Sequence, residues 1–245
     1  MSTSTRLPRS AEFALWYSAW VDGAASLDDA RDAIIGTDAA HHIAGMPGET
    51  ESLPLILALG RFRSVGAAAA GIALPVPGDP LGLAGPGTFN ADALEAGEGV
   101  VFDGADIGLV PHQAGAGVVW RCYQAVSRRQ VPDPWEADSS LRTAVLTAAN
   151  TLADLDVAHW RPEVADELMA LRRSVDFNFP TGMTPRAVKL AALSLRCRTI
   201  VDLALGDDGT TVTAGEADRR RLALSPLDHA ARRGLVAVCS YPWER

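Results

Sequence analysis

Hydrophobic and polar positions follow three different patterns along the chain, and each pattern predicts a different kind of element. In the first part, apolar side chains recur every three to four residues and predict a helix that Ser10 caps and that ends near Trp20. A second predicted helix begins at Ser26, because Ser26 and Asp29 have the spacing of a capping box. The segment DAAHHIAG, residues 38–45, is interpreted as a further helical turn.

Between Leu53 and about Ala125, the pattern changes to short apolar runs separated by glycine, proline and aspartate. These runs are LPLILALGRFRSV, AGIALPVPG, GEGVVFDG, DIGLVPHQ and GVVWRCYQA. Such spacing is typical of strands in a meander or a small barrel. The segment HQAGAG between the last two runs predicts a hairpin connection.

From Pro132 onward, the apolar residues return to helical spacing. Three apolar seams are visible, over residues 141–155, 164–175 and 188–204. A fourth helix is predicted after Thr213, which has the capping-box spacing to Glu216, and a fifth helix is predicted to restart at Pro226. The C-terminal part is therefore predicted to be a helical bundle.

Together these patterns predict an α+β fold. It consists of an N-terminal helical segment, a mostly antiparallel β-sheet or partial barrel, and a C-terminal bundle of four to five helices. The expected segments are 1–52 for the tail and first helices, 53–130 for the β-rich region and 131–245 for the bundle. The alternative that all three pack as one compact domain stays open.

Charge is unevenly spread over a chain of ordinary globular composition, which has 48% hydrophobic residues and a net charge of −8. Residues 11–110 hold 14 acidic and 3 basic side chains, whereas residues 186–245 hold 7 and 10. The longest basic run, Arg219–Arg221, is too short for the clustered basic surface that nucleic acids require. We therefore expect no nucleic-acid partner, while the asymmetry favours head-to-tail contact between protomers.

The cysteines and the hydropathy pattern bear on the cellular compartment. Cys122, Cys197 and Cys239 are far apart, and they predict neither a disulfide framework nor a zinc knuckle. No apolar segment reaches the roughly 18 residues that a membrane span requires. A soluble, cytoplasmic protein without a membrane partner is the expectation.

Metal, cofactor and catalytic motifs are sparse. Asp38 and His42, four residues apart on a predicted helical turn, supply at most half of a metal site. The single lysine, Lys189, follows Val188 and not the glycine of a Walker A loop, and the chain contains no G-x-S-x-G or S-x-x-K motif. We expect no metal, no cofactor and no catalytic residue that a motif would identify.

The loop GDPLGLAGPGTFN, residues 78–90, is the densest cluster of glycine and proline. Its glycines run in the reverse order of the dinucleotide fingerprint, and its prolines donate no backbone N–H. Asn90 is expected to cap a short helix, in which Asp92 and Glu95 would repel a phosphate. The loop is therefore interpreted as a rigid connection at the rim of a pocket, with Asp79 and Asn90 as its polar residues.

A polar pocket is predicted in the β-rich region. On a strand, Arg61 and Arg63 share one face, and Arg121 shares a face with Tyr123. If these strands pair, the arginines gather beside the rim of the loop and His112. The candidate ligand-binding residues are Arg61, Arg63, Asp79, Asn90, His112 and Arg121. Solvent-exposed strand faces without a ligand predict the same pattern, and that alternative stays open.

Two functions are compatible with these observations. The first is a non-catalytic binding or interaction protein that self-associates, with a small-molecule ligand at the junction between the sheet and the bundle. The alternative is an enzyme that acts on a small anionic metabolite. In that case Arg61, Arg63 or Arg121 would hold the negative charge, and His112 would act as acid or base. The sequence does not decide whether the protein is an enzyme.

Overall fold

The fold was analysed in a computed structural model that describes residues 6–126, 130–154, 177–206 and 214–240. The chain forms two compact units. The sheet unit consists of Leu7–Val131, Asn178–Thr184 and the chain from Cys239 onward, and the helical unit holds Pro132–Phe177 and Pro185–Val238. The described residues contain seven helices and one six-stranded sheet, so the predicted α+β class is confirmed.

The sheet is open and mixed, with the strand order β2-β1-β6-β5-β4-β3. The strands are β1 (His41–Ala44), β2 (Leu53–Pro54), β3 (Ala69–Ala73), β4 (Gly99–Asp103), β5 (Ile107–Ala114) and β6 (Gly117–Gln124). Only β1 and β6 are parallel, and every other neighbouring pair is antiparallel. The predicted hairpin is confirmed, because β5 and β6 pair along their whole length up to a two-residue turn.

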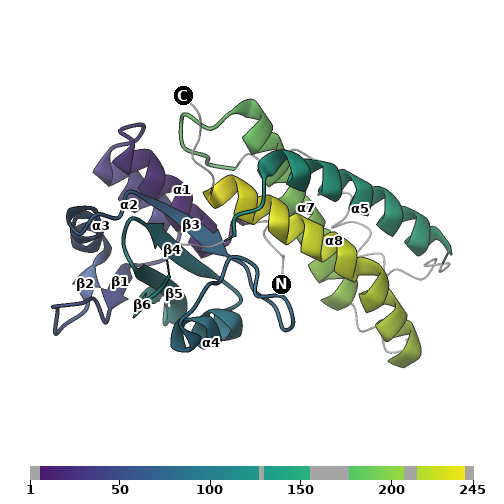
Figure 1. Cartoon of the computed structure of the whole chain (residues 1–245), viewed down its shortest axis with the longest axis horizontal. Coiled ribbons are helices and arrows are strands. Elements are labelled where there is room, and N and C mark those ends of the chain that lie inside the picture. The colour runs from purple at the N-terminus through teal and green to yellow at the C-terminus, as the bar shows by residue number, and fades with distance from the viewer. Residues whose placement is uncertain (1–5, 127–129, 155–176, 207–213, 241–245) are drawn as a thin grey trace. The chain divides into compact units, whose positions relative to one another are not determined.

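Four helices belong to the sheet unit. They are α1 (Arg9–Val21), α2 (Leu27–Ile35), α3 (Leu55–Ser64) and α4 (Gly87–Ala96). Figure 1 shows α1 and α4 on opposite sides of the sheet. The predicted capping box is confirmed at α2, where the Ser26 hydroxyl accepts from the Asp29 N–H. At α1 the residue before the helix is Pro8, so Ser10 lies inside the first turn and does not cap it.

An aromatic core fills the side of the sheet that α1 and α3 cover. Its members are Phe13, Tyr17, Phe62, Phe102 and Trp120, all of them fully buried. The ring centroids of Phe62 and Phe102 lie 4.6 Å apart, and that of Phe13 lies 5.0 Å from Trp120. Because each such ring stabilises the fold by about 1.5–3 kcal/mol when it is fully buried, this cluster is the main hydrophobic core of the unit.

Two short segments differ from the sequence-based prediction. The run that begins at Leu53 was expected to be a strand, but only Leu53–Pro54 forms one, β2. The rest forms α3, which buries Leu55, Leu59 and Phe62 at spacings of four and three. Conversely, the predicted helical turn at 38–45 contains strand β1, which pairs with β6 and β2. A short apolar run fits either element, and here the packing partner decides.

Both edges of the sheet are protected from further strand pairing. At the β3 edge, the Ala70 N–H donates to the Ser18 hydroxyl at 3.0 Å, and the Ile72 N–H donates to the Ser240 hydroxyl at 2.9 Å. At the other edge, β2 is only two residues long and ends in Pro54. Short strands, proline and covered backbone groups all prevent edge-to-edge association.

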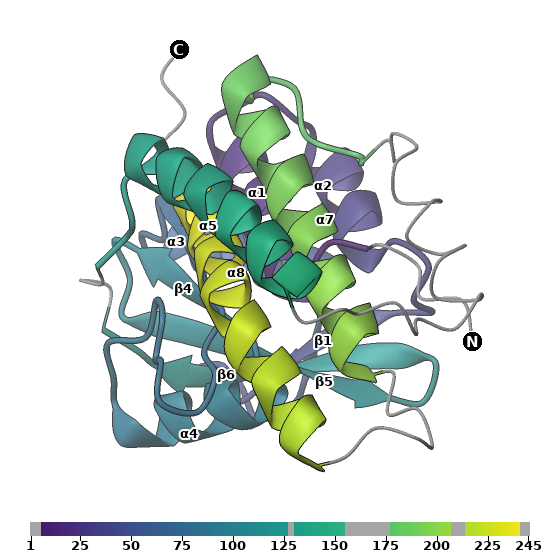
Figure 2. The same ribbon diagram turned by 90° about the vertical axis from the view of Figure 1, so that its right-hand side faces the viewer.

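Three described helices form the helical unit: α5 (Pro134–Asp154), α7 (Pro185–Gly206) and α8 (Ala214–Ser240). Figure 2 shows that they run alongside one another. The predicted restart at Pro226 is wrong, because α8 continues through this proline as one helix. The helix predicted over 164–175 falls on residues outside the described part, and the one predicted after Thr213 corresponds to the first part of α8. A bundle of four to five helices therefore stays a prediction.

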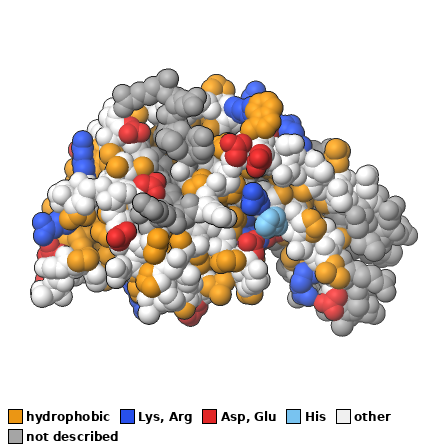
Figure 3. Space-filling view, viewed as in Figure 1, with side chains coloured by type: hydrophobic (Ala, Val, Ile, Leu, Met, Phe, Trp, Pro, Cys, Tyr) orange, Lys and Arg blue, Asp and Glu red, His pale blue; other side chains and the backbone are white. Residues whose placement is uncertain are grey.

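Polar side chains connect these helices at defined points. Asp138 on α5 is paired with Arg142 of the same helix at 3.1 Å and with Arg186 of α7 at 3.5 Å. The Arg186 guanidinium also lies 3.6 Å from the centroid of the Trp135 ring. On the face shown in Figure 3, acidic and basic side chains likewise lie near one another among hydrophobic ones.

Within the described residues, no helix is both long and apolar enough to cross a membrane.

Candidate functional site

The two predicted arginines of residues 61–63 lie on α3 and not on a strand face. Arg61 is paired with Glu49 at 3.4 Å, and Arg63 lies 5.1 Å from the ring centroid of Trp20. The strand alternation that grouped them with Arg121 therefore does not apply. Each arginine contacts its own partner at the periphery of α3.

Asp79 and Asn90 hold the glycine-rich loop together. The backbone of Asp79 exchanges hydrogen bonds with Val76 in a tight turn. The Asn90 side chain accepts from the Gly85 N–H at 3.1 Å. The expectation that Asn90 caps a helix is wrong, since α4 begins three residues earlier, at Gly87.

His112 and Arg121 are brought together by a third residue, Asp92 of α4. His112 Nε2 lies 2.8 Å from Asp92 Oδ2, and the Tyr123 hydroxyl donates to the same oxygen at 2.8 Å. Arg121 lies 3.8 Å from the other carboxylate oxygen. We call these four residues, Asp92, His112, Arg121 and Tyr123, the Asp92 cluster.

The packing of α4 on the sheet places Asp92. Phe89 and Ala93 of α4 are fully buried, and they pack with Val101 and Val110 on the side opposite the aromatic core. Asp92 follows Phe89 by three residues, so it lies on the sheet-facing side of the helix, and its side chain is only 11% exposed. The carboxylate therefore lies at the edge of a small apolar core, where it meets side chains that rise from β5 and β6.

Close approach of α4 depends on a glycine in β5. A Cβ atom at Gly108 would lie 2.7 Å from Phe89 and 2.8 Å from Ala125, which is closer than real contacts allow. The missing side chain leaves room for the Phe89 ring. Gly108 thus sets the distance between α4 and the sheet.

Hydrogen-bond chemistry determines which atoms of the cluster donate and which accept. An ionised carboxylate only accepts, so the His112 Nε2 that faces Asp92 carries a proton. The other ring nitrogen, Nδ1, has no partner within the described residues. Burial raises the pKa of Tyr123, the neighbouring Asp92 raises it further, and Arg121 acts in the opposite direction. Tyr123 is therefore a neutral donor, while Arg121 is 57% exposed and remains open to a ligand.

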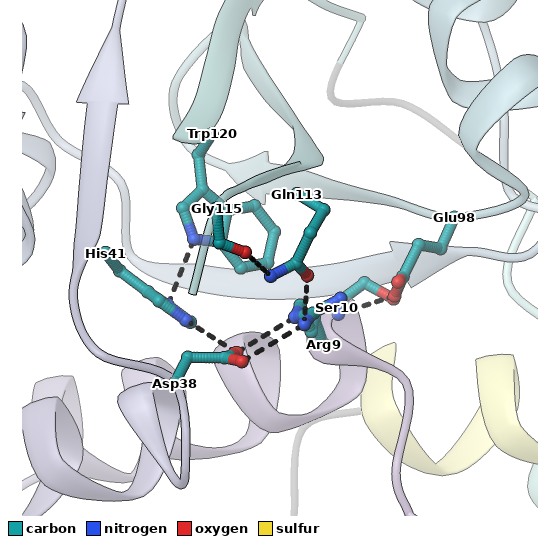
Figure 4. A network of polar contacts seen from close by, with 8 residues as sticks. All are labelled: Arg9, Ser10, Asp38, His41, Glu98, Gln113, Gly115 and Trp120. Atoms are coloured by element: carbon teal, nitrogen blue, oxygen red, sulfur yellow. Dashed lines mark hydrogen bonds and ion pairs between the residues drawn. The ribbon is translucent and has the colours of Figure 1, made fainter. Parts of the chain in front are cut away.

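A second polar network is drawn in Figure 4. It lies on the opposite face of the sheet, because its Trp120 precedes Arg121 on β6 and neighbouring strand residues point to opposite faces. His41 Nε2 lies 3.1 Å from Asp38, which also accepts from Arg9 at 3.0 Å, and His41 Nδ1 accepts from Trp120 at 3.2 Å. Both ring nitrogens are thus in use, and the imidazole is buried. The geometry also corrects the predicted pairing of Asp38 with His42, because β1 turns His42 to the other face.

The same network secures the start of α1. The Glu98 carboxylate accepts from the backbone N–H of Ser10 at 2.8 Å and from the Ser10 hydroxyl at 2.7 Å (Figure 4). A carboxylate at the N-terminus of a helix satisfies a free backbone donor and favours the helix dipole. We call Arg9, Asp38, His41 and Trp120 the His41 network. We assign it to the stability of the sheet unit, because His41 and Trp120 are buried and the Asp38 side chain is only 10% exposed.

Thiol and metal chemistry find little support in the described residues. Burial raises the pKa of Cys122 and of Cys197 to about 11, and it raises the pKa of Cys239 still further. Thiolates are the reactive species, so these cysteines are weak nucleophiles at neutral pH. No group of three His, Cys, Asp or Glu side chains that could hold a metal ion occurs within residues 6–126, 130–154, 177–206 and 214–240.

Sequence reasoning found half of the Asp92 cluster and missed the residue at its centre. His112 and Arg121 were candidates, and Tyr123 was noted only as the neighbour of Arg121 on one strand face. Asp92 was considered only as a charge that repels phosphate. The signal that would have identified Asp92 is its spacing of three from Phe89, which indicates a side chain that faces the sheet.

Comparisons with known proteins cover nearly the whole chain. The family model described as "Rv1486c-like protein, N-terminal domain" matches residues 10–135, and the one described as "Rv1486c-like protein, C-terminal domain" matches residues 135–236. No solved structure matches the chain.

Curated relatives come from mycobacteria. The uncharacterized proteins MT1533 and Rv1486c, from two strains of Mycobacterium tuberculosis, are each 29% identical to the chain over 274 residues, which is 91% of this chain and 93% of theirs. The uncharacterized protein MAV321 of Mycobacterium avium is 36% identical over 119 residues, or 39% of this chain and 38% of its own. These names state no ligand or activity.

Proposed function

The chain belongs to the Rv1486c-like family, and we propose that it is a binding protein that holds a small anionic ligand at the Asp92 cluster. The observation that supports this function is the shared contact of three side chains with Asp92. One carboxylate orients an imidazole, a phenol and a guanidinium from two strands and keeps them together at a partly exposed place.

Pre-orientation is what makes such a cluster suited to binding. A flexible arginine loses side-chain entropy when it binds a ligand, by about 0.5–1.5 kcal/mol for each side chain that becomes fixed. The Asp92 carboxylate restricts Arg121 and His112 before any ligand arrives, so less of this cost remains. The guanidinium keeps donors that Asp92 does not use, and these suit a carboxylate or a phosphate.

The charges of the cluster also favour an anion. Asp92 carries one negative charge, and Arg121 balances it. His112 and Tyr123 also donate to the Asp92 carboxylate, and these contacts weaken its repulsion of a nearby anion. The Nδ1 side of His112 and the exposed part of Arg121 remain as the ligand-facing groups.

Acid–base catalysis is the second candidate function, and one observation favours it. Asp92 fixes His112 through Nε2, so the neutral imidazole would turn the lone pair of Nδ1 outward. A carboxylate that orients a histidine in this way is a common arrangement for a general base. A small anionic substrate held by Arg121 would lie within reach of that nitrogen.

The binding function is tested by calorimetric titration of the full chain with inorganic phosphate and with small carboxylates. We expect Arg121→Gln to weaken the binding of at least one of these anions by about tenfold, the size of one charge-assisted hydrogen bond. Arg142→Gln is the matched control, because Arg142 is also exposed and paired with one aspartate. Equal affinities in the wild type and both variants would rule out the Asp92 cluster as the binding site.

His112→Ala separates binding from catalysis. A large loss of turnover with little loss of affinity would support the acid–base role. Unchanged affinity together with unchanged turnover would remove His112 from both proposals. The other sequence-based expectations, namely self-association, a ligand at the junction between the sheet and the bundle, and a cytoplasmic location, stay predictions.

A further inference from the structure

The strand register arranges His42, Val119 and His112 in one row across three strands. His42 pairs with Val119 in the parallel ladder between β1 and β6, and Val119 pairs with His112 in the antiparallel ladder between β5 and β6. Residues that pair in register carry their side chains on the same face of the sheet. The two imidazoles therefore flank Val119 on the face that carries the Asp92 cluster.

Arg121 completes this arrangement. It follows Val119 by two residues on β6, so it points to the same face. Neighbouring strands are about 4.8 Å apart, which places the backbones of His42 and His112 about 10 Å from each other, one on either side of Val119. Three side chains that can carry positive charge thus rise from three adjacent strands around a single valine.

These side chains are available to a ligand. His42 is partly exposed and makes no hydrogen bond or ion pair within the described residues. His112 uses Nε2 for Asp92 and is 28% exposed, and Arg121 is 57% exposed. Val119 is half-buried and provides an apolar floor between them. The surface therefore combines two side chains that Asp92 holds in place, His112 and Arg121, with a third donor, His42, and with the apolar side chain of Val119.

The distribution of the donors distinguishes between classes of anion. A carboxylate is planar, and one arginine fork satisfies both of its oxygens. A phosphate monoester has three terminal oxygens and a charge of about −1.5 to −2 at neutral pH, so it can accept from several directions at once. Donors that come from three strands match the geometry of a phosphate monoester. A metal ion fits less well, because the two histidines have no third ligand within the described residues.

We propose that the ligand of this surface is a phosphate monoester above Val119, whose terminal oxygens accept hydrogen bonds from His42, from Arg121 and from Nδ1 of His112 in its doubly protonated, cationic form. This assignment rests on the anion binding proposed for the Asp92 cluster. It adds His42, a residue that does not contact Asp92 and comes from a different strand.

The test compares two dianions of similar size, phenyl phosphate and phthalate, on the full chain by calorimetry and by imidazole NMR signals. We expect phenyl phosphate to bind about tenfold more tightly than phthalate and to shift the signals of both His42 and His112. His42→Gln should weaken phenyl phosphate about tenfold and leave phthalate unchanged. His229→Gln, at an exposed histidine of α8, is the control and should change neither affinity.

The outcomes separate this inference from the function on which it rests. Equal affinity for the two dianions, with no effect of His42→Gln, would overturn the phosphate assignment and leave the anion-binding function standing. No binding of either probe at millimolar concentration, with no effect of Arg121→Gln, would overturn both. Thermal unfolding of each variant verifies that a lost affinity is not a lost fold.

Discussion

At Asp92, a single carboxylate from α4 meets donors from two strands of the sheet. Its two bonds of 2.8 Å, to His112 and Tyr123, are short, as expected when one partner is charged. The carboxylate is nearly buried, so loss of its charge would leave these donors poorly satisfied. The cluster should therefore contribute to stability as well as to binding.

We expect Asp92→Asn to lower the free energy of unfolding by about 1–3 kcal/mol, because an amide cannot replace a charged acceptor for several donors at once. Urea denaturation of the full chain measures this difference. Glu95→Gln is the matched control on the same helix, since Glu95 is exposed, and it should change stability by less than about 0.5 kcal/mol. Equal effects of the two substitutions would mean that the contacts of Asp92 carry no stability.

At the scale of elements, the contact between α4 and the sheet determines whether the Asp92 cluster exists. Phe89 occupies the space that a side chain at Gly108 would need. Gly108→Ala should push α4 outward, lower the free energy of unfolding by about 1–3 kcal/mol and weaken anion binding with it. Chemical denaturation and calorimetric titration of the same variant measure the two effects.

Gly87→Ala is the matched control for this substitution. Gly87 lies in the first turn of α4, and a Cβ atom there would meet nothing within 4 Å. Alanine at that position should leave stability unchanged or raise it by up to about 1 kcal/mol, since it reduces the freedom of the unfolded chain. If Gly108→Ala is as well tolerated as Gly87→Ala, the close approach of α4 is not what places Asp92.

The same scale shows which elements could be predicted from the sequence. The β5–β6 hairpin was predictable, because its alternation and its turn are local in the chain. Strand β1 was not, since its parallel partner β6 lies more than 70 residues away and four residues show no clear period. Helix α3 was mistaken for a strand because its consecutive apolar residues, Leu55–Leu59, satisfy both periods.

In the candidate site, too, contacts between residues close in the chain were predictable, and contacts between distant segments were not. His112 and Arg121 were predictable together, because they lie on the two strands of one hairpin. Asp92 could not be joined to them, since its place depends on how α4 packs on a face formed later in the chain. Arg61 and Arg63 were grouped with them only through the mistaken strand.

At the scale of the whole molecule, the sheet unit is not one continuous stretch of chain. Two segments from beyond residue 177 complete it. The Trp16 ring N–H donates to the carbonyl of Asn178 at 3.3 Å, and the Thr181 hydroxyl donates to that of Ala24 at 2.9 Å. Ser240, the last residue of α8, accepts from the Ile72 N–H and covers the edge of β3. The N-terminal half is therefore expected to depend on the C-terminal half for its stability.

A fragment that ends at Val131 lacks all of these contacts. We expect it to unfold at a lower temperature than the full chain and to self-associate through the exposed edge of β3, because unpaired edge groups favour strand addition. Scanning calorimetry and light scattering measure the two effects.

In the full chain, Ser240→Ala isolates the edge contact, and it should lower the free energy of unfolding by about 1–3 kcal/mol, since it leaves a buried N–H unsatisfied.

The control for Ser240→Ala is Ser64→Ala, which removes an exposed hydroxyl that donates to the Arg61 carbonyl at 2.7 Å. A surface change of this kind should alter stability by less than about 0.5 kcal/mol. If the fragment is monomeric and as stable as the full chain, the later segments do not support the sheet. If the fragment is less stable than the full chain but Ser240→Ala is as stable as the wild type, the fragment loses stability through the missing contacts of Trp16 and Thr181 and not through the β3 edge.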